Sequence, residues 1–528
     1  MLVLIMHRFS RSLLLFVVLL GQAAFAQTAD KAPLARGTAI TDPFTLRALD
    51  AGSLGLGRMV GPSNSATAPL ASSELFALPA LQPVRKALDA EFERYIARHK
   101  ATLPNESIGV GPSFAFQLFD RAALDSPDTR FVLSGIVNRM DRAYVDPASC
   151  GEIRLIYRLT PTKAAEIGEA SVSPRLPMTL NMVLKAKGDR DHDAKGTPLT
   201  CAEIARRWLA TEDLKLTGSE LADRLTQDGG ALASVGPDDI VRIETNLQIA
   251  HAPKTESRDF RTDYLMKVFD YDAASKSFEE APLEDQIDRQ RLLADHDLQR
   301  EFKAWLLDPA HLSELDRGTV LIPEKFLSRS AIAPTPTGFA ASNLQPAFGL
   351  VAGEDGTDNP VFSEDDVVGA LKTAAARGIA MQNIRSTAGF ERRLNDVTCA
   401  GCHQTRGIGG FHFPGVDWMA AKPSNTVVVP ASPHFFGDQV RRRDILASFA
   451  AGKPVDFSRG FASRPQSRGS TELAGTEYDN GWGAHCYVQH AKAAEDDASF
   501  RNWSCAEGLA CQAMSPASRM GMCFVKNR

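Results

Sequence analysis

Cys399, Cys402 and His403 form the pattern C-x-x-C-H, to which haem is attached covalently in proteins. The spacing suits this chemistry, because two thiols three positions apart can each form a thioether bond with one vinyl group of the same porphyrin. The imidazole beside the second cysteine is then placed to coordinate the iron. The pattern predicts one covalent haem, with Cys399 and Cys402 as anchors and His403 as the proximal iron ligand.

Two cysteines at this spacing also form redox-active disulfides and zinc sites, so the context of the motif matters. Phe390, Leu394 and Val397 lie at positions i, i+4 and i+7 and form an apolar stripe just before Cys399. A helix with this stripe would carry the motif on its C-terminal end. The stripe is equally what a helix needs to pack against a core.

Cys399, Cys402 and His403 resemble the haem-binding motif of the c-type cytochromes, and the resemblance covers residues 360–440 at most. It implies one covalent haem c and a role in electron transfer or in haem-dependent peroxide or oxygen chemistry. In small cytochromes with one haem, the sixth iron ligand is usually a methionine some tens of residues downstream. This chain departs from that pattern, because Met419 follows His403 by only 16 residues and is the only methionine between His403 and Cys486, the first of the C-terminal cysteines.

The sixth iron ligand therefore has several candidates. His434 and Met419 are the leading ones, followed by His412 and by the upstream Met381. A position left open is the remaining alternative, and it would favour catalysis over electron transfer. Arg406 is a candidate partner for a haem propionate.

Residues 1–26 are typical of a secretory signal peptide. Arg8 and Arg11 precede the apolar run 13–20, and Ala24-Phe25-Ala26 forms a small-x-small cleavage site. No later stretch is long and apolar enough to span a bilayer. The sequence therefore predicts a periplasmic or secreted protein without a transmembrane segment after cleavage.

The composition is that of a globular protein, with 44% hydrophobic and 23% charged residues. The formal net charge of −5 becomes −7 once Arg8 and Arg11 are removed with the signal peptide. Nothing basic indicates a nucleic-acid partner, so a redox partner protein or a small-molecule substrate is expected.

The six cysteines outside the motif are an even number, as expected if all of them pair in an oxidising compartment. Cys150 and Cys201 are predicted to join a strand beginning near Glu152 to a helix beginning near Ala202. The last four cysteines lie within 38 residues and predict a small disulfide-rich module with three possible pairings: Cys486, Cys505, Cys511 and Cys523.

Periodicity predicts an α+β protein with a largely antiparallel sheet, followed by a mainly helical cytochrome c-like region. The expected divisions are a signal peptide at 1–26, an extended arm at 27–75, an α+β domain of unknown role at 76–330, a linker at 331–362, a haem region at 363–470 and a disulfide-rich module at 471–528. Strands are predicted at 113–119, 131–138, 152–159, 178–187, 240–250 and 263–271. Helices are predicted at 81–100, 201–210, 218–227 and 285–306, and from Ser363 to Gly378.

Together these features predict an exported haem protein that acts in redox chemistry. The alternative is a secreted binding or structural protein in which the C-x-x-C-H segment is structural or a redox disulfide.

Overall fold

A computed structural model of the chain describes residues 36–61, 69–108, 121–162, 178–188, 192, 195–254, 261–333, 350, 361–400, 433–459, 485–487, 504–505, 509–513 and 520–525. The predicted signal peptide at 1–26 and the predicted strand at 113–119 lie outside the described residues.

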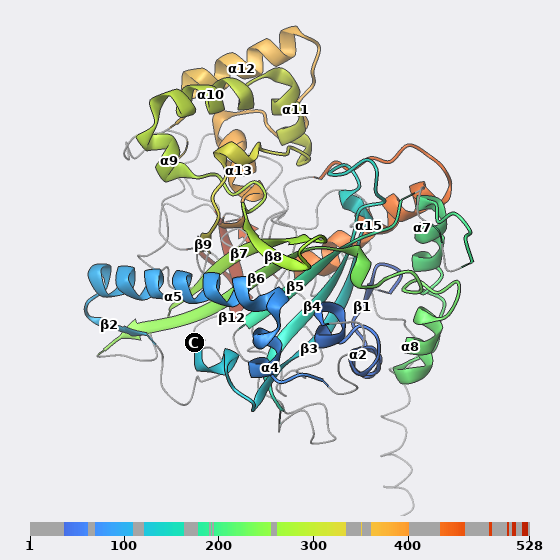
Figure 1. The fold of residues 1–528 in the computed structure, drawn as a ribbon. Coiled ribbons are helices and arrows are strands. Elements are labelled where there is room, and N and C mark those ends of the chain that lie inside the picture. Colours follow the sequence, from blue (N-terminus) through green and yellow to red (C-terminus); the bar gives the residue numbers. More distant parts are fainter. Residues whose placement is uncertain are drawn as a thin grey trace, which may run out of the picture.

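The largest element is an antiparallel sheet of nine strands (Figure 1). Seven strands follow one another in space: β1 (Ala39–Ile40), β3 (Thr129–Arg139), β4 (Glu152–Pro161), β5 (Met178–Lys185), β6 (Ile240–Pro253), β7 (Arg261–Asp272) and β8 (Ser277–Ala281). Two short strands extend it, because β2 (Glu106–Ile108) pairs with β6 and β9 (Ala331–Ala333) pairs with β7. The predictions of an antiparallel sheet and of mixed α and β content are confirmed.

Alternation along β6 explains how the sheet buries one face. Ile243, Leu247 and Ile249 are almost fully buried in the main core, whereas Val241, which the alternation also placed inside, is exposed at the end of the strand. Side chains two positions apart share a face of a strand, so these residues form a continuous apolar surface. Five predicted strands, all but that at 113–119, match β3 to β7 within a few residues.

Helices and helical turns cover this sheet. They are α2 (Pro43–Ala51), α3 (Leu56–Val60), α4 (Ser72–Ala77), η1 (Pro79–Leu81), α5 (Gln82–Thr102), η3 (Arg121–Leu124), η4 (Met140–Arg142), α7 (Cys201–Leu209), α8 (Gly218–Thr226), η5 (Pro237–Asp239) and α15 (Pro433–Ala450). The predicted helices at 81–100, 201–210 and 218–227 correspond to α5, α7 and α8. Thr217 is the N-cap residue of α8, but its side chain makes no capping hydrogen bond.

The segment from 36 to 61 differs from the extended arm that its composition predicted. It contributes β1 to the sheet and forms α2 and α3, whose residues Leu46 and Leu56 are buried in the main core. A local signal does start α2, because the Asp42 side chain accepts a hydrogen bond from the Thr45 backbone and Pro43 follows it. The high content of Ala, Gly and Ser hid these short helices.

A second group of helices forms a lobe at one end of the sheet (Figure 1). Its elements are α9 (Arg289–Ala294), α10 (His296–Leu306), α11 (Pro309–Arg317), η6 (Glu324–Phe326), α12 (Glu364–Ala376) and α13 (Thr387–Val397). They share one apolar core that includes Phe302, Phe362 and Phe390. Helices on both sides of the expected linker at 331–362 therefore pack together, and that linker begins with strand β9.

The single helix predicted at 285–306 is wrong. Asp295 ends α9 and caps α10, since its side chain accepts hydrogen bonds from the backbone of Asp297 and Leu298. A residue that caps one helix in this way adopts an extended conformation and interrupts the preceding helix. The predicted helix from Ser363 to Gly378 is confirmed as α12, which begins with a Ser363–Asp366 capping box and is followed by Gly378 with a φ of +77°.

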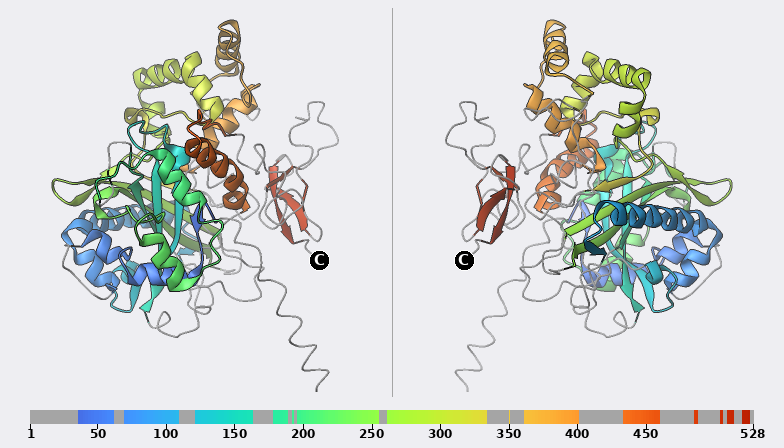
Figure 2. Two further views of the ribbon diagram at one scale, coloured as in Figure 1. Left: turned by 90° about the vertical axis from the view of Figure 1, so that its right-hand side faces the viewer. Right: turned by 90° about the vertical axis from the view of Figure 1, so that its left-hand side faces the viewer.

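The described C-terminal residues form a small antiparallel sheet of three strands, which stands apart from the large sheet in Figure 2. Its strands are β10 (His485–Tyr487), β11 (Leu509–Ala513) and β12 (Met520–Val525). Cys505 and Cys511 are disulfide-bonded. Among the helices that the structure describes, none is both long enough and apolar enough to cross a membrane.

The predicted disulfide between Cys150 and Cys201 is confirmed, and it joins the residues just before β4 to the first residue of α7. It closes a loop with a sequence separation of 51 residues. Replacing both cysteines by alanine is expected to lower the free energy of unfolding by about 2–5 kcal/mol. Urea unfolding of the variant and the parent checks this value, and an unchanged midpoint would contradict it.

Candidate functional site

The motif begins directly after α13, and the structure describes its first cysteine. The predicted apolar stripe is confirmed, since Phe390 and Leu394 are buried and Val397 packs partly against the same core. Cys399 is half-buried. Cys402 and His403 lie outside the described residues, so their predicted roles as anchor and iron ligand stay predictions.

Most candidates for the sixth iron ligand also stay predictions. Met419 and His412 lie outside the described residues, as does Arg406. His434 is the second residue of α15, but its side chain is not among those described. Met381 packs partly buried against the apolar core of the helical lobe, which is a structural role.

The loop that follows β8 holds the start of the motif in place. The backbone N–H of Ala400 donates to the side chain of Gln286 at 2.9 Å, and the thiol of Cys399 donates weakly to the Glu284 carbonyl at 3.8 Å. Cys399 and Ala400 also pack in a small apolar cluster with Met266 of β7. The chain therefore enters the motif at a defined position above the sheet.

Cys399 lines a cavity of about 310 Å³ between the sheet and the helical lobe. The apolar part of the lining includes Val268, Leu283 and Val397. The ionisable part comes from β4, β6, β7 and the loops around them: Arg142, Tyr144, Arg154, Arg242, Glu244, Lys267, Asp270, Glu284, Asp285, Glu324 and Arg459. An apolar cavity with convergent charged groups is typical of a binding site.

Buried ion pairs connect this cavity to the end of the sheet. Glu152 lies at the centre of the first group, with its carboxylate 3.1 Å from Arg142, 2.7 Å from Arg154 and 2.9 Å from Arg242. The last two arginines also pair with Glu244, at 3.2 Å and 3.0 Å. Arg142 pairs in addition with Glu284, whose backbone carbonyl contacts Cys399.

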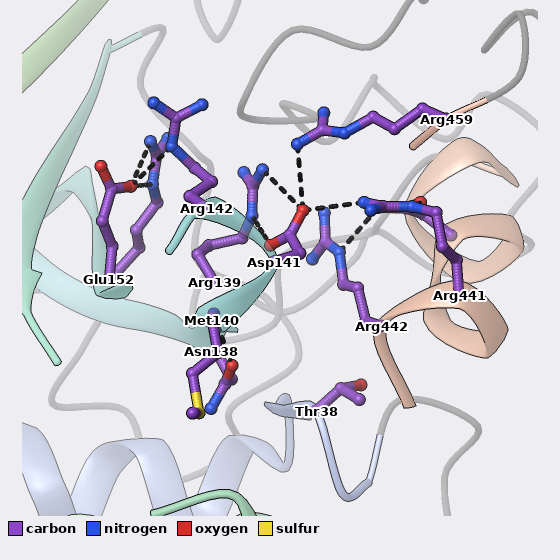
Figure 3. Close-up of polar contacts among 12 residues, drawn as sticks. Thr38, Asn138, Arg139, Met140, Asp141, Arg142, Glu152, Arg441, Arg442 and Arg459 are labelled. Atoms are coloured by element: carbon purple, nitrogen blue, oxygen red, sulfur yellow. Dashed lines mark hydrogen bonds and ion pairs between the residues drawn. The ribbon is translucent and has the colours of Figure 1, made fainter. Parts of the chain in front are cut away.

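The second group surrounds Asp141, which is fully buried (Figure 3). Its carboxylate lies 2.8 Å from Arg139, 2.7 Å from Arg441 and 3.0 Å from Arg459. Asp438 of α15 holds Arg441 and Arg442 at 2.7 Å each. Because Arg139 lies opposite Glu152 in the pairing of β3 with β4, the two groups are continuous.

Arginines are the main charged groups of this arginine network. Among the residues that the structure describes, it contains seven arginines and five carboxylates: Arg139, Arg142, Arg154, Arg242, Arg441, Arg442 and Arg459, with Asp141, Glu152, Glu244, Glu284 and Asp438. Four of these arginines also line the cavity, so an anion bound there would meet guanidinium groups: Arg142, Arg154, Arg242 and Arg459.

The pKa values of the acidic groups agree with this distribution of charge. Burial raises the pKa of Asp141, but the charges of Arg139 and Arg441 outweigh burial and hold that pKa well below its usual range. The same balance holds for Glu152, whose pKa is lowered mainly by Arg142 and Arg154. Burial and the neighbouring Glu284 raise the pKa of Asp285 well above its usual range.

The arginine network was missed by sequence reasoning, although two local signals pointed to it. One is the run Asn138-Arg139-Met140-Asp141-Arg142, which places three charged residues directly after a buried strand. The other is the triplet 441–443 on α15, which is unusual for a helix that packs against the protein body. Neither signal shows that the two segments meet, because they lie some 300 residues apart in the sequence.

Comparisons of the chain with protein-family models, with curated proteins and with solved structures found no match. The function must therefore be inferred from the residues of this chain alone.

Proposed function

We propose that this chain is an exported c-type haem protein that acts in redox chemistry. One covalent haem would serve either in electron transfer or in haem-dependent chemistry with peroxide or oxygen. The observation that carries the proposal is the position of Cys399. The first cysteine of the motif lines a cavity that is connected to a cationic, buried network.

The residues of the cavity fit a haem in three respects. Thioether formation needs a cysteine sulfur that faces a space for the porphyrin edge, and Cys399 lines such a space. The porphyrin needs apolar contacts, which Val268 and Leu283 offer. Its two propionates need cations, and Arg142, Arg242 and Arg459 line the cavity. When bound, the haem supplies an iron that changes oxidation state.

The protein's own residues would hold the haem by its propionates. Guanidinium groups such as those of Arg242 and Arg459 are rigid and always charged, so they fix propionates by direct hydrogen bonds. The Cys150–Cys201 disulfide supports an extracytoplasmic compartment, which is also where haem is attached to C-x-x-C-H.

Extraction with acidified acetone tests the proposal. The chain is produced in a host that exports it and attaches haem c, and it is then purified without a tag. We expect the haem absorption to stay with the polypeptide after extraction and to change reversibly on reduction. A colourless protein would favour the alternative, in which a secreted binding or structural protein uses Cys399 and Cys402 as a disulfide.

Single substitutions at His434 and Met419 separate the two kinds of redox chemistry. If one of them is the sixth ligand, the reduced parent protein is low-spin and binds carbon monoxide slowly. Replacing that residue by alanine is expected to open the site, whereas the other variant and His412→Ala keep the parent spectrum. Rapid carbon monoxide binding by the parent would instead indicate an open position and a catalytic haem.

A further inference from the structure

A cluster of ionisable side chains lies at the other end of β6, away from the cavity. His99 comes from the last turn of α5, Glu106 begins β2, and His251 lies near the end of β6. Figure 1 shows β2 beside the end of α5. From Glu244, which lines the cavity, to His251 is seven residues of extended chain, or roughly 23 Å.

The backbone brings these three residues together. β2 and β6 are antiparallel, with Ile108 opposite His251 and Glu106 opposite Pro253. Glu106 and His251 are therefore diagonal neighbours on one face of the strand pair. A short turn after α5 brings His99 to the same face, since Glu106 N donates to Leu103 O at 3.0 Å. One possible ligand atom from each of His99, Glu106 and His251 lies within 4.8 Å of the other two.

One buried polar atom in this cluster has no hydrogen bond to the residues that the structure describes. His99 is only 2% exposed, and this atom is its Nε2. A buried polar atom left in this state costs about 1–3 kcal/mol. The ring of His99 packs edge-on against the ring of His251, with 5.2 Å between centroids. A bound cation would give the Nε2 atom of this imidazole the partner that the described residues do not provide.

The surroundings of His251 match those of a metal ligand. Its Nδ1 atom faces Glu106, and its Nε2 atom lies 3.2 Å from the carboxylate of Asp263. The hydroxyl of Tyr95 donates to the same Asp263 oxygen at 2.9 Å. Histidines that bind metals usually donate their other N–H to a carboxylate, which fixes the orientation of the ring.

We propose that His99, Glu106 and His251 form a binding site for a divalent transition-metal ion, with Asp263 as the carboxylate that orients His251. Two imidazoles and one carboxylate are a ligand set for zinc and for non-haem ferrous iron. Three protein ligands leave a coordination position for water, as in catalytic zinc sites rather than structural ones. This site is independent of the proposed haem.

Zinc titration of the untagged full-length protein, first treated with a chelator, tests the site. We expect one zinc ion per chain, measured by elemental analysis after gel filtration and by calorimetry with zinc chloride alone. Glu106→Gln and His99→Gln are each expected to weaken zinc binding at least tenfold, and Asp263→Asn about 10–100-fold. His296→Gln, at an exposed position on α10, is the matched control and should bind zinc like the parent.

If a variant folds poorly, the change in its melting temperature on adding zinc still tests the site. Zinc that binds only the native state raises the melting temperature of the parent and of His296→Gln, but not that of Glu106→Gln. Absence of zinc binding by the parent would overturn the proposal. So would equal zinc affinities of the parent, Glu106→Gln and His99→Gln, and the cluster would then be an ion pair of His251 with two carboxylates.

Discussion

Replacing both Cys399 and Cys402 by alanine is expected to abolish covalent haem attachment. The thioether bonds are the only covalent link between haem and chain in this account, so no haem should remain with the polypeptide after acid-acetone extraction. Each single replacement should leave at most one thioether bond and a lower haem content. The measurement is the ratio of haem absorbance to polypeptide in the extracted protein.

The matched control removes two other cysteines. The variant with Cys150→Ala and Cys201→Ala lacks the disulfide beside β4, and its folded fraction should carry haem in the parent ratio. Comparing the two double variants shows whether haem is lost because the motif cysteines are absent or because any two cysteines are absent. Covalent haem in the variant without Cys399 and Cys402 would refute the attachment site.

Asp141→Asn is expected to be the most destabilising single substitution in the arginine network. Asp141 is fully buried, and its carboxylate contacts Arg139, Arg441 and Arg459. Asparagine keeps the size of the side chain but removes the charge, so the surrounding guanidinium groups lose this buried counter-charge. Breaking a buried ion pair from one side costs about 3–5 kcal/mol, measured as the loss in free energy of unfolding.

Asp228→Asn is the control for this substitution. Asp228 pairs with Lys195 at 2.8 Å, but both side chains are largely exposed, so the same chemical change should cost less than about 1 kcal/mol. Similar losses for the two variants would contradict the role given to burial.

The pH dependence of Asp141→Asn gives a second check. The native pKa of Asp141 is held well below that of an unfolded chain, so its stabilising contribution is present above about pH 4 and is lost as the pH falls further. The stability difference between the parent and Asp141→Asn should therefore shrink below pH 4. A difference that grows with acidity would have the wrong sign.

Much of the sheet could be predicted from the sequence, because burial of one face imposes alternation on each strand. β6 shows this, since Ile243, Leu247 and Ile249 alternate with more polar residues. The disulfide followed from the small number of cysteines in the N-terminal half. The capping box at Ser363 and Asp366 followed from local hydrogen bonding, which short sequence patterns record well.

Other features depend on contacts between distant segments. The helices at 43–60 are short and weakly patterned, and their stability comes from burial of Leu46 and Leu56 in a core that the rest of the chain provides. The break between α9 and α10 depends on one capping residue, Asp295, within a pattern that is otherwise helical. Periodicity alone does not detect either feature.

The candidate site also combines a feature contained in a short sequence segment with a feature that depends on contacts between distant segments. The motif at Cys399 is local and was recognised from spacing alone. The arginine network joins β3, β4, β6 and α15, so no segment of sequence contains it. Charged residues are also expected at the surface, so the two local signals are not enough to predict that Arg139, Arg154 and Asp141 are buried.

The intact mass of the mature wild-type protein tests the central claim most directly. The chain is expressed with a working system for cytochrome c maturation, purified from the exported fraction, denatured and measured by mass spectrometry. We expect the mass of the polypeptide after residue 26 plus the mass of one haem. A mass without haem under these conditions would contradict covalent haem attachment at Cys399 and Cys402.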